Sequence, residues 1–479
     1  MLLADPIKTE YGYVSGTMIG DAGQKVRTYR GIPYASPPLG ELRWQPPQPA
    51  MPWQGIRECT AYSAVTPQLI GFGPTTPLAQ SEDCLYLNVV TPAQKASEDL
   101  PVMVFMHGGG FTGGHGNEKL FNSARLARHG VVLVTVNMRL EALGLFCHPL
   151  LSRESSIGVS GNYIFLDMIA ALKWVQQNIA AFGGDPDNVT IFGESGGGAK
   201  VAILMASPLA KGLFQRAILE SAWNPPDGAM SGASLKYMEQ FGERLFAKLG
   251  IAKEAHPLKA ARALPVQQIL EANAALCREE NVLIGIWDEA VDGWVLPDKA
   301  LNILSSDKYN AVPFIAGGNL GEITDDSSIL FLPHMIPLYV EMFKGAEKTK
   351  TKAYAYIFNR VPDGRKKAGL KSAPHGMELY YVFGDYDNTS GWWNRPPPPR
   401  SGNTSPAPAP FVAVDPELSA IDKKVSEEMM AMWAHFAKTG NPSVKDLIYW
   451  PAWDKATDKY LYIDEPLQVK LGFSGIKKK

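Results

Sequence analysis

Short apolar runs beside glycines alternate with helical patterns along the middle of the chain. Residues 100–109 and 130–140 are rich in β-branched side chains, which is typical of strands buried in a parallel sheet. Residues 163–182 repeat apolar side chains at helical spacing, and 188–193 form another β-branched run before a second helical pattern. This succession predicts an α/β fold with a mostly parallel central sheet flanked by helices.

The second half of the chain continues this pattern after a helical interruption. Residues 232–285 show helical patterning without strong strands, so we expect 232–310 to be a helical cap or lid inserted into a single domain, 1–479. Strand character returns at 312–318 and 353–361.

Two segments near the C-terminal end have distinct compositions. Residues 395–411 are rich in proline, which excludes a helix or a central strand and predicts a surface loop. Residues 417–442 form an amphipathic pattern that predicts a helix ended by Gly440 and Pro442.

Composition and charge exclude several classes of protein. The chain has 479 residues, 46% of them hydrophobic and 20% charged, which is typical of a globular protein. No stretch has the roughly 18 unbroken apolar residues that a membrane span requires. A net charge of −2 makes nucleic acid an unexpected partner, and we favour a monomer.

The amino-terminal residues and the cysteines bear on the cellular compartment. The start of the chain lacks the basic and apolar regions of a secretory signal, so we favour the cytoplasm; a secreted or periplasmic protein stays open if a signal has been removed. The four cysteines form no C-x-x-C pair, which disfavours a zinc site and favours reduced thiols. Pairing of Cys59 with Cys84 stays open for an oxidising compartment.

A serine between glycines, in "GESGG" (193–197), is the strongest chemical signal. The G-x-S-x-G pattern alone is weak, because this composition gives roughly 0.2 to 0.3 matches by chance. Here it follows a predicted strand and precedes a predicted helix, the setting of a nucleophile elbow. The pattern therefore predicts that Ser195 is a nucleophile and that Gly193 and Gly197 relieve crowding in the turn.

An acyl-transfer site also requires hydrogen-bond donors for the oxyanion. The sequence "HGGGF" (107–111) follows a predicted strand and supplies glycine amides, of which we choose Gly109 and Gly110, with Gly196 as the third donor. We expect His107, at the start of this loop, to be structural.

The base is a histidine that follows both the serine and the acid in the chain order of α/β-hydrolases. His256 and His435 lie in predicted helices, and His334 comes too soon after the candidate acids. His375, in a loop with proline and glycine, is therefore the predicted base.

The carboxylate that orients the histidine base is expected after the strand at 312–318. Glu322 is nearest the strand end, whereas Asp325 and Asp326 read better as a solvated or helix-capping pair.

Longer motifs along almost the whole chain resemble the type-B carboxylesterase family, which includes cholinesterases and bacterial p-nitrobenzyl esterases and has the α/β-hydrolase fold. The motifs occur in the family's order: "RGIPYASPPLGELRW" (30–44), "SEDCLYLNVVTP" (81–92), "HGGGF", "FGGDPDNVTIFGESGGG" (182–198), "SPLAKGLFQRAILES" (207–221) and "FAKTGNPS" (436–443). The resemblance implies Ser195 as nucleophile, Glu322 as acid and His375 as base.

The same resemblance implies further roles. The oxyanion donors fall on Gly109, Gly110 and Gly196, and a network behind the triad on Glu194 and Ser221, for each of which an ordinary buried hydrogen bond is an equal alternative.

The chain departs from the family at several positions. Gly196 stands where alanine is usual, which is expected to loosen the elbow, and Thr66 stands at the usual partner position of Cys84 in a family disulfide. No tryptophan precedes "SEDCL" (81–85) as in cholinesterases, so a choline site is not expected. Only 52 residues separate Glu322 from His375, fewer than the family usually has, and this short interval predicts an open pocket. The tryptophans of 390–400 either line the rim of this pocket or pack within a surface loop.

The sequence thus predicts a carboxylic-ester hydrolase that acts on a small-molecule ester through an acyl-enzyme, without a metal or an organic cofactor. Two alternatives stay open. The same residues suit amide, carbamate or lactone hydrolysis, and the cholinesterase-like fold also serves non-catalytic binding proteins, which typically lose triad residues.

Overall fold

A large sheet forms the middle of the molecule. The computed structural model describes residues 5–20, 24–69, 78–222, 232–280, 285–324, 335–367, 369–385 and 418–477. Among these, an 11-stranded sheet has the order β16-β15-β14-β13-β10-β9-β7-β8-β6-β4-β3. In chain order its strands are β3 (Thr17–Ile19), β4 (Val26–Pro33), β6 (Tyr86–Thr91), β7 (Leu100–Met106), β8 (Val132–Val136), β9 (Gly184–Glu194), β10 (Arg216–Glu220), β13 (Phe314–Asn319), β14 (Ala353–Phe358), β15 (Lys459–Ile463) and β16 (Gln468–Leu471).

The seven central strands, from β8 through β7, β9, β10, β13 and β14 to β15, are parallel to one another. The outer strands β6, β4, β3 and β16 pair antiparallel. The prediction of a mostly parallel sheet is therefore confirmed. Carboxyl ends of parallel strands meet at one edge, which is where α/β proteins place their sites.

Helices cover both faces of the sheet. Val102 and Val104 of β7 pack in one core with α4 (Tyr163–Asn178) and α5 (Gly196–Ala206). Met103 and Phe105, which point the other way, pack in a second core with α14 (Ala420–Thr439). Because both faces are buried, the central strands consist of continuous apolar runs rather than alternating ones, as the sequence shows.

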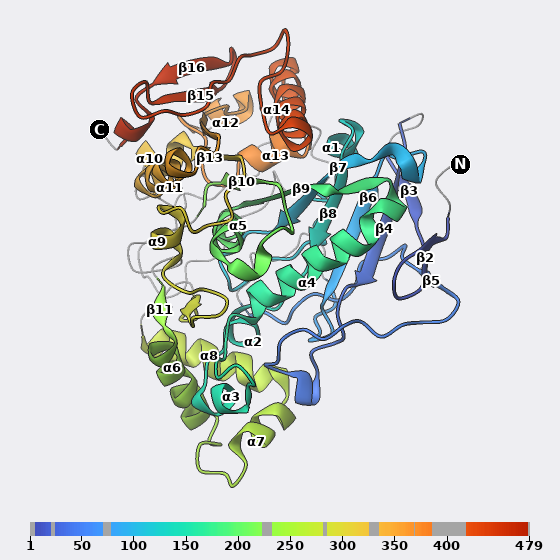
Figure 1. Ribbon diagram of the computed structural model, residues 1–479, viewed down its shortest axis with the longest axis vertical. Helices are drawn as coiled ribbons and strands as arrows, with labels where there is room; N and C mark the ends of the chain where they lie inside the picture. The colour runs from blue at the N-terminus through green and yellow to red at the C-terminus, as the bar shows by residue number, and fades with distance from the viewer. Residues whose placement is uncertain are drawn as a thin grey trace.

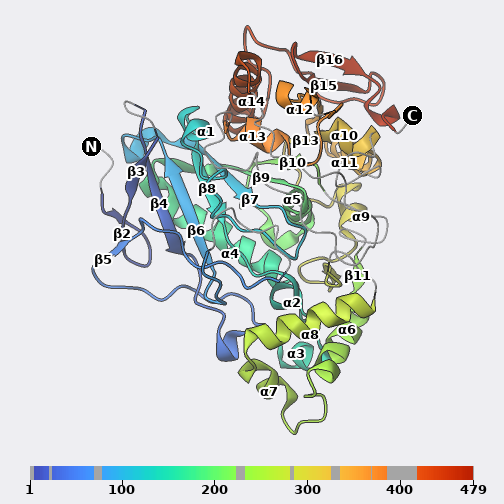
Figure 2. The same cartoon turned by 180° about the vertical axis from the view of Figure 1, so that it is seen from behind.

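The helices predicted within 232–285 are present as α6 (Leu235–Lys248), α7 (Pro257–Ala263) and α8 (Val266–Glu279). They gather with α3 (Pro149–Glu154) at one end of the molecule, away from α14 (Figures 1 and 2). No helix in the described ranges is long and apolar enough to cross a membrane.

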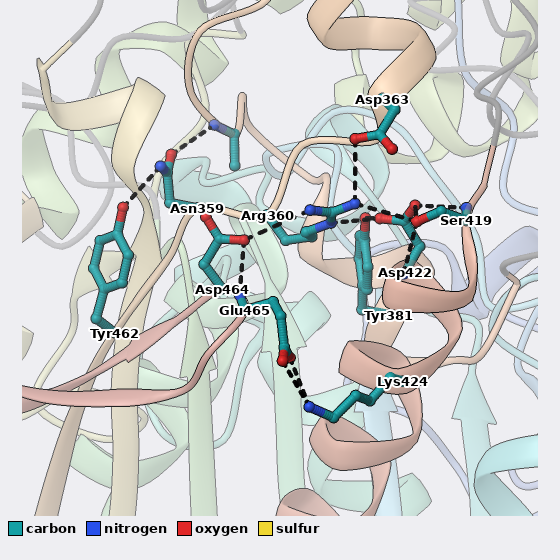
Figure 3. Close-up of polar contacts among 11 residues, drawn as sticks. Asn359, Arg360, Asp363, Tyr381, Ser419, Asp422, Lys424, Tyr462, Asp464 and Glu465 are labelled. Carbon is teal, nitrogen blue, oxygen red and sulfur yellow. Dashed lines mark hydrogen bonds and ion pairs between the residues drawn. The ribbon is translucent and has the colours of Figure 1, made fainter.

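Helix α14 begins and ends where the sequence pattern places it, within three residues. Ser419 caps its first turn in a reciprocal box with Asp422, and Gly440 ends it with a φ of 74°. Asp422 also accepts hydrogen bonds from Arg360 Nε (2.6 Å), which follows β14, and from the hydroxyl of Tyr381 (2.9 Å) in α13 (Glu378–Val382) (Figure 3). This buried network joins α14 to the segment that carries His375.

All four cysteines are buried free thiols. Thr66 contacts the thiol of Cys84 and donates its hydroxyl to Met138 O over 2.5 Å. The proline-rich segment 395–411 and the tryptophans of 390–400 lie outside the described residues, as do His334, Asp325 and Asp326.

Candidate active site

Ser195 lies in a strained turn between β9 and α5. Its φ of 59° and ψ of −126° are angles that a residue with a side chain rarely adopts. Its backbone N–H donates to Glu220 O over 2.9 Å, and its carbonyl accepts from Ala199 N, which fixes the turn on both sides. The side chain is thereby placed at the N-terminus of α5, where a developing negative charge is favoured.

Glycines make this turn sterically feasible. A Cβ at Gly193 would lie 2.6 Å from Met106 O, the last carbonyl of β7, and 2.6 Å from Gly197 C. A Cβ at Gly197 would overlap the same Met106 carbonyl. The crowding predicted from the pattern is therefore confirmed.

His375 and Glu322 are joined by a hydrogen bond. Glu322 lies in α10 (Leu320–Thr324), directly after β13, and is completely buried. Its Oε1 is 2.8 Å from Nδ1 of His375, which lies in the turn before α13. An imidazole held in this way through Nδ1 presents Nε2 to the reacting group.

Nε2 of His375 lies beside a second carboxylate. Glu194 Oε1 is 3.2 Å from Nε2, although this oxygen accepts no hydrogen bond within the described part of the chain. The hydrogen bonds of the described residues include none between Ser195 and His375. The structure therefore brings His375 to Glu322 and Glu194, and places Ser195 next to Glu194 along the chain.

The two carboxylates set the electrostatics of the imidazole. Burial alone would lower the pKa of His375, but the charges of Glu194 and Glu322 outweigh it and raise the pKa above its ordinary value. Burial raises the pKa of Glu194 as well. The site thus favours a protonated imidazole, the form that results when histidine takes a proton from serine.

Two further glutamates that the sequence reasoning missed lie behind this pair. Glu220 accepts from Trp433 Nε1 over 2.7 Å, and burial raises its pKa to about 8. Glu378 accepts from Ser221 Oγ over 3.0 Å and from the side chain of Asn319. Its pKa also lies above the usual range, through burial and neighbouring carboxylates.

Signals for both were present in the sequence. Glu220 ends an apolar strand as Glu194 does, and the two are paired residues of β10 and β9. Glu378 follows His375 by one helical turn. Of the network expected from the family, Glu194 thus contacts His375, whereas Ser221 contacts Glu378.

The glycine loop after β7 packs against the serine turn. Gly109 and Gly110 have φ of 89° and 62°, which favour glycine. A Cβ at Gly108 would lie 3.3 Å from Ser195 Cβ, and a Cβ at Gly196 would lie 2.5 Å from Gly110 Cα. The structure therefore gathers the three candidate oxyanion glycines, and Gly196 stands where the loop leaves no room for alanine.

Of the remaining histidine candidates, His107 and His435 have structural contacts. Nδ1 of His107 is 2.8 Å from Gly108 O, and its pKa is lowered by burial and by the nearby charge of Lys200. Nδ1 of His435 is 2.8 Å from Asn441 O, and His256 precedes the first residue of α7. No group of three or more candidate ligands in the described ranges is arranged to hold a metal.

Comparison with known proteins extends the likeness to the whole chain. The family model described as "Carboxylesterase family" matches residues 4–334 and 334–475. A para-nitrobenzyl esterase of Bacillus subtilis (strain 168) is 32% identical over 97% of this chain and 96% of its own length. A fumonisin B1 esterase of Sphingopyxis macrogoltabida is 33% identical over 92% and 84%, and carboxylesterase 1C of Mus musculus 33% over 98% and 90%.

Solved structures agree with the sequence relatives. A PNB esterase structure superposes with a TM-score of 0.79 at 30% identity and covers 97% of this chain and 96% of its own. A thermophilic PNB esterase superposes with a TM-score of 0.77 at 29% identity, over 97% of both chains. These likenesses confirm the α/β-hydrolase fold, and the chain belongs to the carboxylesterase family.

Proposed function

We propose that Ser195, His375 and Glu322 hydrolyse a small carboxylic ester through an acyl-enzyme. Carboxylic-ester hydrolysis follows from membership of the family; the roles of the individual residues are the proposal. The observation that carries it is the strained Ser195 at the N-terminus of α5, directly after Glu194, whose carboxylate lies 3.2 Å from Nε2 in the His375–Glu322 pair.

The reaction begins with the transfer of the Ser195 hydroxyl proton to Nε2 of His375 as the serine oxygen attacks the ester carbonyl. Glu322 orients the ring through Nδ1, and Glu194 and Glu322 together stabilise the imidazolium. We propose that the His375 ring turns so that Nε2 leaves Glu194 and approaches the Ser195 hydroxyl. Catalytic hydrogen bonds often form fully only when substrate is bound.

The negative oxygen of the tetrahedral intermediate is bound by the N–H groups of Gly109, Gly110 and Gly196. Collapse of the intermediate releases the alcohol, which takes the proton from His375. The same histidine then removes a proton from a water molecule, whose oxygen attacks the acyl carbon. The carboxylic acid departs as the serine oxygen takes that proton from His375.

We also propose that the chain forms one domain, 1–479. Within it, the segment 232–310 covers the substrate site as a cap. Support comes from Gly285, whose Cβ would lie 3.3 Å from Glu141 Oε1, next to Phe111 and Thr112 of the glycine loop. A cytoplasmic location is likewise a proposal, supported by the four buried free thiols, and a monomer is proposed with it.

Hydrolysis of p-nitrophenyl butyrate tests the proposed function. The wild type is expected to release p-nitrophenol, and Ser195→Ala is expected to lose about ten-thousandfold in kcat while its circular dichroism spectrum is unchanged. An inactive wild type would contradict ester hydrolysis. Comparable activity of the folded Ser195→Ala variant would contradict the role of the serine.

A further inference from the structure

A lysine lies in the interior beside the glycine loop, and no step of the proposed reaction uses it. Lys200 follows Ser195 in α5 and has no exposed surface. Burial lowers its pKa to about 7, and no carboxylate among the described residues forms an ion pair with its Nζ. Because an unpaired buried ammonium group is costly, a lysine at this position requires an explanation.

Its contacts are two carbonyl groups at the two ends of the glycine loop. Nζ donates to His107 O over 2.9 Å and to Gly110 O over 3.1 Å. The ring of Phe111, the residue after the loop, has its centroid 5.8 Å from Nζ. Lys200 therefore connects helix α5 to both ends of the segment that contains Gly109 and Gly110.

The third candidate donor lies on the same face of this helix. Gly196 and Lys200 are four residues apart, so both face the glycine loop. A Cβ at Gly196 would come within 2.5 Å of Gly110 Cα, and Gly110 is one of the two residues that Lys200 holds. Gly196 thus leaves room for the loop to lie close to the helix, and Lys200 holds the loop there through hydrogen bonds.

We propose that Lys200 is a positioning residue that holds the oxyanion loop against α5, so that the N–H groups of Gly109, Gly110 and Gly196 converge on one point. This role rests on the proposed function, because it concerns the same oxyanion site. The loop can approach this closely only because position 196 is glycine. Without Lys200 the loop is free to move away from α5, and the donors then stabilise the transition state less.

The test compares Lys200→Met and Lys200→Gln with the wild type on p-nitrophenyl butyrate and on a trifluoromethyl ketone, whose adduct with serine carries an oxyanion. We expect kcat to fall about tenfold to a hundredfold with KM nearly unchanged, and ketone affinity to weaken by the same factor. Ile203→Val, which removes a buried methylene from the same helix, is expected to lower only stability.

A second measurement addresses the coupling between Lys200 and Gly196, with circular dichroism used to check that each variant folds. Gly196→Ala is expected to reduce kcat/KM strongly in the wild type and less in Lys200→Gln, because the released loop can move away from the new methyl group. Equal effects in both backgrounds would overturn the proposal.

The two proposals fail in different ways. If the wild type is active and the folded Lys200 variants keep its kcat and its ketone affinity, the role of Lys200 is wrong while the triad stands. If the wild type hydrolyses no ester, both are overturned.

Discussion

His375 is held between Glu322 at Nδ1 and Glu194 at Nε2, and this arrangement controls when it is neutral. Each carboxylate stabilises the protonated ring, so the pKa of His375 is raised even though its surroundings are largely buried. A general base works only in its neutral form. The activity is therefore expected to rise with pH as His375 loses its proton.

Replacing Glu194 by glutamine removes one of these charges while keeping the shape of the side chain. The pKa of His375 then falls, and the acidic limb of kcat/KM against pH is expected to move to lower pH by about one unit. Glu271→Gln, on the exposed surface of α8, serves as the control. A limb that stays in place or moves to higher pH would show that Glu194 does not act on the base.

Among single residues, the sequence predicts the candidate site residues from their order in the chain and from local motifs, and the structure joins His375 to Glu322. Ser195, Glu322 and His375 follow the required order, and the two glycine motifs indicate the oxyanion donors. Glu220 and Glu378 were missed because their proximity depends on strand register and on the fold of the His375 turn. Lys200 was missed because it reads as one residue of an ordinary helix.

The helix α14 stabilises the His375 segment through a buried ion pair at its own N-terminus. Arg360 and Asp422 have side chains that are 5% and 0% exposed, and Tyr381 of α13 shares the same carboxylate (Figure 3). Burial alone would raise the pKa of Asp422, yet the hydrogen bonds from Arg360 and Ser419 hold it below its usual range. The stability from this pair is present above the ordinary carboxyl pKa and is lost as the pH falls through the lower folded value.

Asp422→Asn is expected to reduce the free energy of unfolding by about 3 kcal/mol at pH 7, because Arg360 loses its buried counter-charge. Asp363→Asn removes a half-exposed partner of the same arginine, 3.5 Å away, and is expected to cost less than about 1 kcal/mol. Urea unfolding measures both. Equal stabilities for the two variants at pH 7, or a difference that grows in acid, would contradict this account.

The sequence predicted elements well where one pattern ran unbroken. The strands β7, β8 and β14 and the helices α4 and α14 lie within predicted segments, and β9, β13 and α5 overlap theirs but extend beyond them. The strand β4 was not predicted because Gly31 and Pro33 interrupt its pattern and its register shifts. The order of the strands was not predicted either, since it depends on hydrogen bonds between residues far apart in the chain.

In the molecule as a whole, Arg43 links the helical insertion to the body of the protein. Arg43 pairs with Glu82 over 2.6 Å, and its Nη1 donates to Ala261 O, Arg262 O and Leu264 O over 2.8 to 3.1 Å. The side chain is 7% exposed, so water cannot replace these contacts without opening the interface. The position of α7 and α8 therefore depends on a residue more than two hundred positions away.

Arg43→Met is expected to expose residues 232–280 to protease, because three carbonyls and one carboxylate lose their donor. Native-state proteolysis with mass mapping of the fragments should show faster cleavage in this segment. Arg153→Met, at an exposed position of α3, is the control. Cleavage at the wild-type rate would mean that Arg43 does not hold the insertion.

In the proposed reaction Ser195 is a nucleophile activated by His375, and covalent labelling reports this activation. A p-nitrophenyl organophosphate reacts with an activated serine, and tandem mass spectrometry identifies the modified residue. We predict one label on Ser195 in the wild type, none in Ser195→Ala, and labelling slowed at least about a hundredfold in His375→Ala. A label on another residue, or an undiminished rate in His375→Ala, would contradict the account.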